Sequence, residues 1–454
     1  MKKISFLTIC SLFLCNIYIH AQSWFAVGNT DFSSGIADDL SIAIDTGGTP
    51  YVVYTDVGNS NKATVMKSNG SSWVNVGSAG FSVGEALNTS IAIDKSGTSY
   101  VAYQDVSNGF AATVMKFNGS SWVTVGSPGF SAGEAFGISI AIDTGGTPYV
   151  AYEDDANGMK ATVMKFNGSN WVSVGSPGLS ANEAGNLSIV IDSRGTPYVA
   201  YTDFSVDFRA TVMKYNGGNW ITVGSLGFSA AEAGYISLAL DGNGIPYVAY
   251  ADAANNFKAT VMKFNDSNWV TVGAADFSAD TAAYTSIVIN GSGIPYVVYS
   301  DYANDRKVTV MSYNGSSWSA TGSPGFSPGP ALGYKWITTN ASGTPYVVYR
   351  DQDNDYKATV MRFGWPAEIK NINYSTLSLI VFPNPTSGSF TFNISSSSQE
   401  NATTTITNIL GEVIKQLTVP TNKEMEIQLE ALPGIYFITV NTPEGRQSAK
   451  VEVL

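Results

Sequence analysis

Aspartates recur along the chain at a spacing that could place a ring of carboxylates on one face of a repeat protein. Each follows a Tyr by two positions, and successive members are 49 or 50 residues apart. The series is Asp56, Asp105, Asp154, Asp203, Asp252, Asp301 and Asp351. Such a ring could accept hydrogen bonds from sugar hydroxyls or bind a cation. The alternative is structural: each Asp accepts from the backbone two residues on and pairs weakly with a following basic residue. Those basic residues are Lys62, Lys160, Arg209, Lys258, Lys307 and Lys357.

Four glutamates are expected on the same face as these aspartates. They are Glu85, Glu134, Glu183 and Glu232, and their places are taken by Ile36, Thr281 and Pro330 in the other repeat units. A side chain that the fold required would not be missing from three units of seven. We therefore interpret the glutamates as solvated loop charges, with contact to a ligand as the alternative.

The seventh unit departs most from the others and is a second candidate for a binding site. It has one extra residue, Trp336 replaces the Ser that opens the inner strand elsewhere, and Arg350 stands where other units have Thr, Gln, Glu, Ala or Ser. The run "DQDNDYK" alternates Asp as a calcium loop does, but the Gly and the later Glu of an EF-hand are missing. We predict no metal and no cofactor. Closure of a ring of units would also change the packing here, which is the structural explanation.

The exported chain lacks the two residue types that most often act as bases and nucleophiles. Residues 1–21 have two lysines, an apolar run and a terminal Ala21, which is typical of a secretory signal peptide. Cys10, Cys15 and His20 all lie in that segment, and the chain has no other Cys or His. Their loss excludes Ser-His-Asp and Cys-His catalysis, zinc sites with nitrogen and sulfur ligands, and disulfides. We expect a binding protein and not an enzyme, with a carboxylate-dependent glycoside hydrolase as the alternative.

The charge balance narrows the expected partners. The formal net charge is −12, and it becomes −14 once Lys2 and Lys3 leave with the signal peptide. Nucleic acids and anionic membranes reward clustered Lys and Arg, so we expect neither as a partner. No later apolar run approaches the roughly 18 residues that a membrane-spanning helix needs. The expectation is an acidic, exported monomer.

Tryptophans give the period of the elements that must position the candidate residues. They stand 49 residues apart at Trp24, Trp73, Trp122, Trp171, Trp220, Trp269 and Trp318. Each unit contains four short alternating strands, which in the third unit are 139–143, 148–154, 160–167 and 171–175. Gly- and Asn-containing turns separate them. A period of roughly 40 to 50 residues, rich in Val, Ile, Tyr and Thr, is typical of an all-β propeller.

The two ends of the array indicate how the ring closes. The chain enters with a lone Trp strand at 23–28 and leaves after 357–364, where the next Trp strand is degraded to "WPAEIK". The N-terminal strand can therefore complete the last blade and leave no free sheet edge. We predict a seven-bladed β-propeller over residues 22–365. The first half of each unit, as in "SIAIDTGGTPYVAYEDD", resembles NHL-type propeller repeats, which supports the fold and implies no function.

The composition changes after Trp365, and a second domain is expected at 376–454 beyond a linker at 366–375. Its motifs are "FPNPTSGSF", "ILGEVI", "LEALPGIYFITV" and "AKVEVL". In this order they resemble the type A C-terminal sorting domain of the type IX (Por) secretion system. The matching positions are Pro383, Asn384, Pro385, Gly388, Gly411, Leu432, Gly434 and Tyr436. The resemblance implies a small β-sandwich, the type IX machinery as partner, and delivery to the cell surface or the medium, usually with removal of the tail. The alternative is an ordinary accessory sandwich.

Repetition of one unit favours a multivalent function. Seven similar weak sites on a rigid ring can hold a polymer by avidity where a single site could not. We therefore expect a secreted or surface-displayed binding or adhesion module for a glycan or a protein, which uses the face bearing Asp56 and its equivalents. The alternative is a scaffold whose only site lies in the irregular seventh unit, near Trp336 and Arg350.

Overall fold

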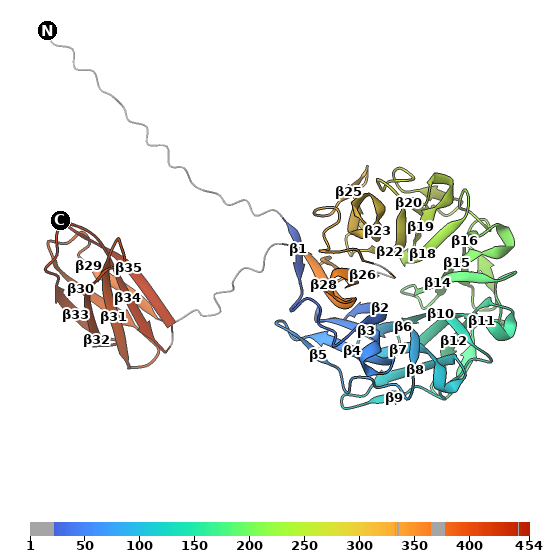
Figure 1. Ribbon diagram of the computed structural model, residues 1–454, viewed down its shortest axis with the longest axis horizontal. Coiled ribbons are helices and arrows are strands. Elements are labelled where there is room, and N and C mark those ends of the chain that lie inside the picture. Colours follow the sequence, from blue (N-terminus) through green and yellow to red (C-terminus); the bar gives the residue numbers. More distant parts are fainter. Residues whose placement is uncertain (1–21, 332, 334–335, 365–376, 444) are drawn as a thin grey trace, which may run out of the picture. The chain divides into compact units, whose positions relative to one another are not determined.

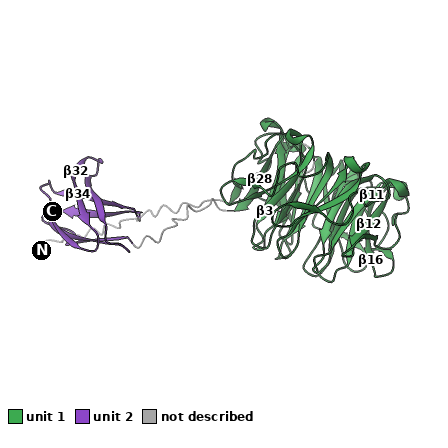
Figure 2. Ribbon diagram, turned by 90° about the horizontal axis from the view of Figure 1, so that it is seen from below, with its two compact units in different colours: residues 1–366 green, residues 367–454 purple. Residues whose placement is uncertain are grey.

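The computed structural model describes residues 22–331, 333, 336–364, 377–443 and 445–454. The predicted signal peptide and the predicted linker lie outside these residues. The chain divides into two compact units, residues 1–366 and 367–454, which are described separately (Figure 2).

The first unit is a ring of seven four-stranded antiparallel sheets around a central axis, so the predicted seven-bladed propeller is confirmed (Figure 1). Blade one is β2 (Ala37–Ile44), β3 (Pro50–Asp56), β4 (Lys62–Ser68) and β5 (Trp73–Asn75). Blade two is β6 (Ala86–Ile93), β7 (Ser99–Asp105), β8 (Ala111–Phe117) and β9 (Trp122–Thr124). Blade three is β10 (Ala135–Ile142), β11 (Pro148–Asp154), β12 (Lys160–Phe166) and β13 (Trp171–Ser173). Blade four is β14 (Ala184–Ile191), β15 (Pro197–Asp203), β16 (Arg209–Tyr215) and β17 (Trp220–Thr222).

The remaining blades have the same order of strands. Blade five is β18 (Ala233–Leu240), β19 (Pro246–Asp252), β20 (Lys258–Phe264) and β21 (Trp269–Thr271). Blade six is β22 (Ala282–Ile289), β23 (Pro295–Asp301), β24 (Lys307–Tyr313) and β25 (Trp318–Ala320). Blade seven is β26 (Trp336–Thr339), β27 (Pro345–Asp351), β28 (Lys357–Gly364) and the N-terminal β1 (Ser23–Ala26).

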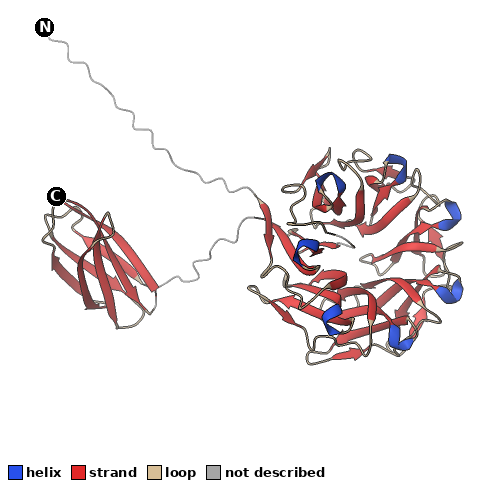
Figure 3. Cartoon of the chain, in the orientation of Figure 1, coloured by secondary structure: helices blue, strands red, loops and turns tan. Residues whose placement is uncertain are grey.

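The propeller has two faces that carry different connections. One short 3-10 helix follows the second strand of each blade (Figure 3). These are η1 (Val57–Asn59), η2 (Val106–Asn108), η3 (Asp155–Asn157), η4 (Phe204–Val206), η5 (Ala253–Asn255), η6 (Tyr302–Asn304) and η7 (Gln352–Asn354). We call this side the 3-10 face. The opposite side carries the tight turns between the first and second strands, such as 45–49, and we call it the turn face.

Ring closure follows the prediction from the two ends of the array. The strand β1 pairs antiparallel with β28, with Trp24 opposite Phe363. The first strands of neighbouring blades contact one another all round the axis, including β26 with β2. The ring therefore has no unpaired edge between its first and last blades, which removes the exposed edge that would template aggregation.

The tryptophans join each blade to the one before it. In blade two, the Trp122 indole Nε1 donates to the Val76 carbonyl oxygen at 2.7 Å, and its ring stacks on Phe81 with centroids 4.2 Å apart. The same indole bond recurs from Trp73, Trp171, Trp220, Trp269 and Trp318, and from Trp24 to the Thr321 carbonyl oxygen. Aromatic rings thus fill the gaps between the blades, and each of these indole N–H groups has its acceptor.

The second unit is a β-sandwich, as the sorting-domain resemblance implied. One sheet contains β29 (Ser378–Phe382), β30 (Ser389–Ser395) and β33 (Glu424–Gln428). The other contains β31 (Asn401–Asn408), β32 (Val413–Pro420), β34 (Gly434–Thr442) and β35 (Gly445–Val453). Alternate residues of these strands, such as Phe390, Phe392, Ile406 and Ile438, are buried between the two sheets. This alternation is what a two-layer β structure requires.

Candidate functional site

The recurring aspartates on the 3-10 face are buried, which corrects the expectation of an accessible ring of carboxylates. All seven lie at the last position of a second strand and are at most 2% exposed. They are Asp56, Asp105, Asp154, Asp203, Asp252, Asp301 and Asp351. A buried carboxylate cannot receive a sugar hydroxyl or a solvated cation without rearrangement of its loop, so the structural alternative describes them.

Asp105 illustrates how the loop uses this carboxylate. Oδ1 accepts from the Ser107 backbone N–H at 3.1 Å, which caps the 3-10 helix, and Oδ2 accepts from Asn108 and from the Thr113 hydroxyl, both at 2.9 Å. The predicted weak pairing with the following basic residue is absent. Among the described residues, the ion pairs within 4 Å are Arg194–Asp192, Arg350–Asp38 and Lys450–Glu452.

The four glutamates lie on the 3-10 face in loops that lead into the first strands. Glu183 and Glu232 are exposed, whereas Glu85 and Glu134 are half-buried. Glu85 accepts a hydrogen bond from the Asn61 side chain at 2.9 Å. None of the four lines the central pocket described below. Contact of these side chains with a ligand stays a prediction.

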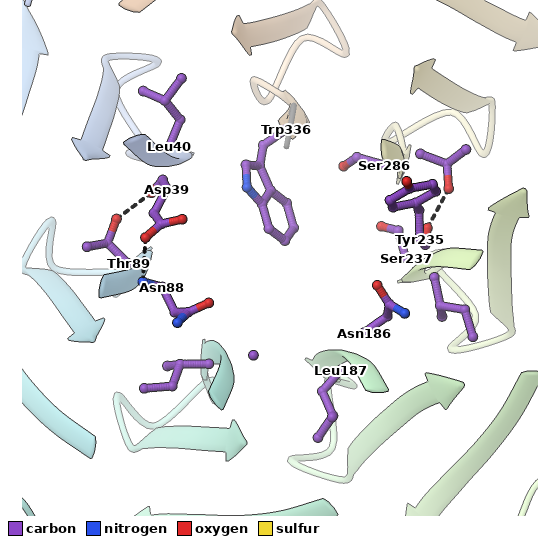
Figure 4. A pocket seen from close by; sticks show the side chains of 14 residues that line it. Asp39, Leu40, Asn88, Thr89, Asn186, Leu187, Tyr235, Ser237, Ser286 and Trp336 are labelled. Atoms are coloured by element: carbon purple, nitrogen blue, oxygen red, sulfur yellow. Dashed lines mark hydrogen bonds between the residues drawn. The ribbon is translucent and has the colours of Figure 1, made fainter. Parts of the chain in front are cut away.

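A pocket opens at the centre of the ring, where the first strands of the blades converge. Figure 4 shows the side chains of Trp336 and Asn186 pointing toward its middle, with Asp39 and Tyr235 on opposite sides of Trp336. The lining residues are Asp39, Leu40, Asn88, Thr89, Gly137, Ile138, Asn186, Leu187, Tyr235, Ile236, Ser237, Thr285, Ser286 and Trp336. Six blades contribute through their equivalent positions and the seventh through Trp336. The pocket therefore combines one large aromatic ring with carboxylate, amide and hydroxyl groups.

A β-bulge in the first strand of blades one to six turns one side chain of each strand toward the axis. In blade two, the register with the second strand shifts between Leu87 and Ser90, and Asn88 has a φ of 51°. The same shift occurs in blades one to six, with Asp39, Gly137, Asn186, Tyr235 and Tyr284 in the same left-handed conformation. A bulge of this kind redirects one side chain and leaves the strand paired on either side. The first strands of blades one to six accordingly begin four residues earlier than the sequence suggested, as β10 does at Ala135.

The bulge position is also where the repeat units differ. The successive residues there are Asp39, Asn88, Gly137, Asn186, Tyr235 and Tyr284, in units that are otherwise nearly identical. Sequence reasoning concentrated on what the units share and missed these positions. A column-by-column comparison of the seven units, searched for variation next to a constant strand, would have found them.

In blades one to four, the bulge residue contacts or leaves room for a second variable residue sixteen positions later. The Asn88 side chain donates to Gln104 Oε1 at 3.2 Å, and Asn186 donates to the Thr202 hydroxyl at 3.2 Å. In blade three, Gly137 leaves space that Glu153 fills, because a Cβ at Gly137 would lie 2.8 Å from Glu153 Oε1. The two positions therefore change together from blade to blade, and the pocket has no rotational symmetry.

Two carboxyl groups near the pocket have raised pKa values. Burial raises the pKa of Glu153 to about 7, although a hydrogen bond from the Asn186 backbone N–H partly offsets it. Burial also raises the pKa of Asp39, against hydrogen bonds from the Asn88 backbone N–H and the Thr55 hydroxyl. Desolvation disfavours the charged form of a carboxyl, so Glu153 changes its protonation state near neutral pH.

The two irregular residues of blade seven lie in different places. Trp336, a candidate ligand-binding residue, is half-buried and lines the pocket. Arg350 forms an ion pair with Asp38 of blade one, and its guanidinium lies 5.5 Å from the centre of the Tyr356 ring. Arg350 is not among the lining residues, and its contact with Asp38 links the last blade to the first.

The sorting motif residues shape loops that hold the C-terminal strand of the second unit. Asn384 donates from its side chain to the Lys450 carbonyl oxygen at 2.6 Å and accepts from the Glu452 backbone N–H at 2.8 Å. The Tyr436 hydroxyl donates to the Leu432 carbonyl oxygen at 2.7 Å. Pro383 and Pro385 flank Asn384, Gly388 and Gly411 occupy turns at positive φ, and Gly434 begins β34. These contacts explain why the motif constrains several separated positions.

Within the described part of the chain, no group of three or more Asp and Glu side chains is arranged to hold a metal ion. No helix within the same residues has the length and apolar character needed to cross a membrane.

Comparison with known protein families identifies the tail. Residues 380–453 match the family model described as a secretion system C-terminal sorting domain. No curated protein sequence matches the chain.

Comparison with solved structures concerns the propeller. A lectin from Burkholderia pseudomallei is 16% identical, with 76% of this chain and 97% of that chain covered at a TM-score of 0.56. A polysaccharide lyase described as an ulvan lyase is 12% identical over 74% of this chain and 95% of its own, with a TM-score of 0.49. A lectin from Aleuria aurantia is 15% identical over 66% of this chain and 100% of its own, with a TM-score of 0.45. At 16% identity, the likeness to the Burkholderia pseudomallei lectin shows the fold alone.

Proposed function

We propose that this chain, which carries a C-terminal sorting domain of the type IX secretion system and is exported to the cell surface or beyond it, binds a carbohydrate in the central pocket of its propeller. One observation carries the proposal: the repeated blades place different side chains at the bulge position beside this pocket, and the pocket contains a half-buried Trp among polar side chains. Export places the pocket among extracellular polymers.

The chemistry of the pocket suits a sugar ring. A pyranose has an apolar face that stacks on an indole, and hydroxyls that exchange hydrogen bonds with amides and carboxylates. Trp336 supplies the indole, Asn88 and Asn186 supply amides, and Asp39 supplies a carboxylate. Behind Asn88, Gln104 is 2% exposed and its Nε2 has no hydrogen-bond partner among the described residues, so a buried water would satisfy it.

The test is glycan-array binding of the exported chain, followed by titration with the best ligand. Trp336→Ala should weaken binding by about tenfold or more, because stacking on an aromatic ring contributes roughly 1 kcal/mol beyond the buried area. Trp336→Phe should retain most of the affinity, since it keeps an aromatic face. Asn186→Ala should also weaken binding, by removal of a hydrogen-bonding amide at the opposite side of the pocket.

The matched control is Glu183→Gln, in an exposed loop on the 3-10 face outside the pocket lining, which should bind as the wild type does. Thermal melting of each variant separates loss of binding from loss of fold. The proposal is wrong if Trp336→Ala and Asn186→Ala, both folded, bind every glycan like the wild type. A loss confined to Glu183→Gln would instead favour the loop glutamates as the contact surface.

Glycoside cleavage in the same pocket is a second candidate, favoured by the raised pKa of Glu153. A carboxyl that stays protonated near neutral pH can act as a general acid. Glu153 lies behind Gly137 of the pocket lining, and Asp39 lines the pocket as a second carboxyl group. The test is release of new reducing ends from polysaccharides by the wild type and by Glu153→Gln. Release by the wild type alone would support catalysis, and release by neither protein, with glycan binding intact, would leave the pocket as a binding site.

A further inference from the structure

Grooves between neighbouring blades open on the turn face, away from the central pocket. The groove between blades two and three has a volume of about 610 Å³, and the one between blades three and four about 510 Å³. The residues that line the second groove are those of the first shifted by 49 positions, so Tyr100, Lys116 and Asp143 correspond to Tyr149, Lys165 and Asp192. Tyr149 and Lys165 line both grooves. The grooves are thus repeated and joined.

The basic residue of each groove lies next to a Tyr on the neighbouring strand. In blade three, Lys165 pairs in register with Tyr149, and its ammonium lies 5.8 Å from the centre of the Tyr149 ring. The same contact occurs between Lys67 and Tyr51 at 5.6 Å and between Lys263 and Tyr247 at 5.7 Å. The cation–π contact holds the Lys ammonium over a Tyr ring at the groove wall. The Lys side chain therefore loses less conformational entropy when a ligand binds.

Basic residues occupy this register position in six of the seven blades. They are Lys67, Lys116, Lys165, Lys214, Lys263 and Arg362, which we call the basic ring, and blade six has Ser312 instead. All six are half-buried. The chain has a net charge of −12, but nearly every repeat has a cation at this one position. The charge contributed at this position is therefore opposite in sign to that of the chain as a whole.

The carboxylates of the grooves do not cancel this charge. Each of the two grooves has two lysines and one aspartate, and the groove between blades three and four also has Arg194, which forms an ion pair with Asp192 at 3.7 Å. Asp143 Oδ1 already accepts from the backbone N–H groups of Gly145 and Thr147, at 2.8 and 2.9 Å. An anion in the groove would therefore meet an excess of positive charge and tyrosine rings.

We propose that the grooves of the turn face bind a polysaccharide that carries sulfate or carboxylate groups at intervals along its chain. Its anionic groups pair with the ammonium groups of the basic ring, and its sugar rings pack against the tyrosines. This site is separate from the central pocket, and its occupancy does not depend on the carbohydrate proposed there. Because Lys165 belongs to two grooves, the polymer runs from groove to groove, and affinity rises with the number of grooves that it spans.

A polysaccharide fits these grooves better than a nucleic acid does. The overall charge of the exported chain repels a long, densely charged duplex, whereas a polymer with spaced charges can follow the ring and avoid the acidic surface elsewhere. Sorting through the type IX system also brings the protein to an extracellular environment.

The experiment measures retention of the exported chain on immobilised dextran sulfate and on polygalacturonate, with uncharged dextran as reference. The groove variant carries Lys→Gln at 67, 116, 165, 214 and 263. The wild type should be retained on both charged polymers and released by added salt, because ion pairs at a surface are screened. The groove variant should bind at least tenfold more weakly. Lys165→Gln alone should lose a smaller part of the affinity.

The chain offers a matched control on the same strands. Lys62, Lys160, Lys258, Lys307 and Lys357 are equally half-buried, but they lie at the start of the third strands on the 3-10 face. Lys→Gln at these five positions changes the net charge by the same amount and should leave retention within about twofold of the wild type. A Lys→Arg variant at the five groove positions keeps the charge and should restore binding.

Three outcomes would overturn the proposal. One is a folded groove variant that is retained like the wild type. Another is an equal loss of retention in both five-residue variants, which would mean that only the net charge of the protein matters and not the position of the lysines. The third is retention of duplex DNA by the wild type with no retention on either charged polysaccharide, which would assign the basic ring to nucleic acid.

Discussion

The carboxylate of Asp105 shows what most of the recurring acidic residues do at the scale of single residues. It collects a backbone N–H, an amide and a hydroxyl inside one loop, and it is 1% exposed. Loss of this acceptor leaves the buried Thr113 hydroxyl without its acceptor and also removes the hydrogen bonds from the exposed Ser107 and Asn108. A buried donor left unsatisfied costs about 1–3 kcal/mol. The carboxylate therefore stabilises the connection between the second and third strands, and it is not available to a ligand.

Asp105→Ala should lower the free energy of unfolding by about 1–3 kcal/mol, with rearrangement of the loop limiting the loss to this range. Thermal or urea unfolding measures the change. The control is Asp155→Ala, which removes an exposed Asp from the 3-10 helix of blade three and should change stability little. Equal stability of both variants and the wild type would show that the buried acceptor is dispensable.

Glu153 gives the molecule a pH dependence of known sign. Its pKa in the folded protein is about 7, above the usual value of 4.5, so the folded state holds the proton more tightly than the unfolded state does. The stability that this group contributes is fully present below about pH 4.5 and is lost as the pH rises through about 7. The melting temperature of the wild type should therefore fall relative to that of Glu153→Gln between pH 5 and pH 8. Parallel curves for the two proteins over that range would contradict the assignment.

At the scale of elements, each outer strand is joined to the preceding blade by a Trp that packs over a Gly. A Cβ added at Gly126 would lie 3.0 Å from the Phe166 ring and 3.1 Å from the Trp171 ring, and Gly126 has a φ of 72°. Glycine is needed there both for its conformation and for the close approach of the indole. The contact between blades thus depends on a residue that has no side chain.

Gly126→Ala should destabilise the protein more than Gly119→Ala does. Both residues have positive φ, but a Cβ at Gly119 meets no atom within 4 Å. The first substitution adds a steric conflict with a packed ring to the backbone strain that both share. Melting temperatures of the two variants isolate the packing between blades. If Gly119→Ala proves equally destabilising, backbone conformation alone explains the requirement for glycine.

At the scale of the whole molecule, the ring depends on contact between the two ends of the array. The strand β1 supplies the fourth strand of blade seven, and Trp24 stacks on Phe326 with centroids 4.5 Å apart. Loss of β1 would expose the edge of β28 and remove the buried Trp24 ring.

Deletion of residues 22–28 should therefore lower the melting temperature and promote aggregation of the exported chain. Deletion of 367–454, which belong to the other compact unit, should leave the melting transition of the propeller unchanged. Differential scanning calorimetry and light scattering follow both effects. An intact, monomeric propeller without β1 would mean that the ring closes by its first strands alone.

The sequence by itself determined the architecture, because the 49-residue period, the alternating strands and the unmatched Trp strand at the start admit few other arrangements. It also indicated the sorting tail through motifs at separated positions. These inferences rest on local patterns, since turns, strand alternation and inter-blade tryptophans repeat in every unit and reinforce one another.

Only the tertiary structure decided where the candidate site lies. Burial of Asp56 and its equivalents depends on how the loop folds over the carboxylate, and a sequence cannot tell an exposed acceptor from a satisfied one. The central pocket depends on a bulge that turns Asp39, Asn88 and Asn186 toward one axis, although these residues are 49 to 147 positions apart in the chain. Convergence of such distant residues is a property of the closed ring, and no single repeat unit contains it.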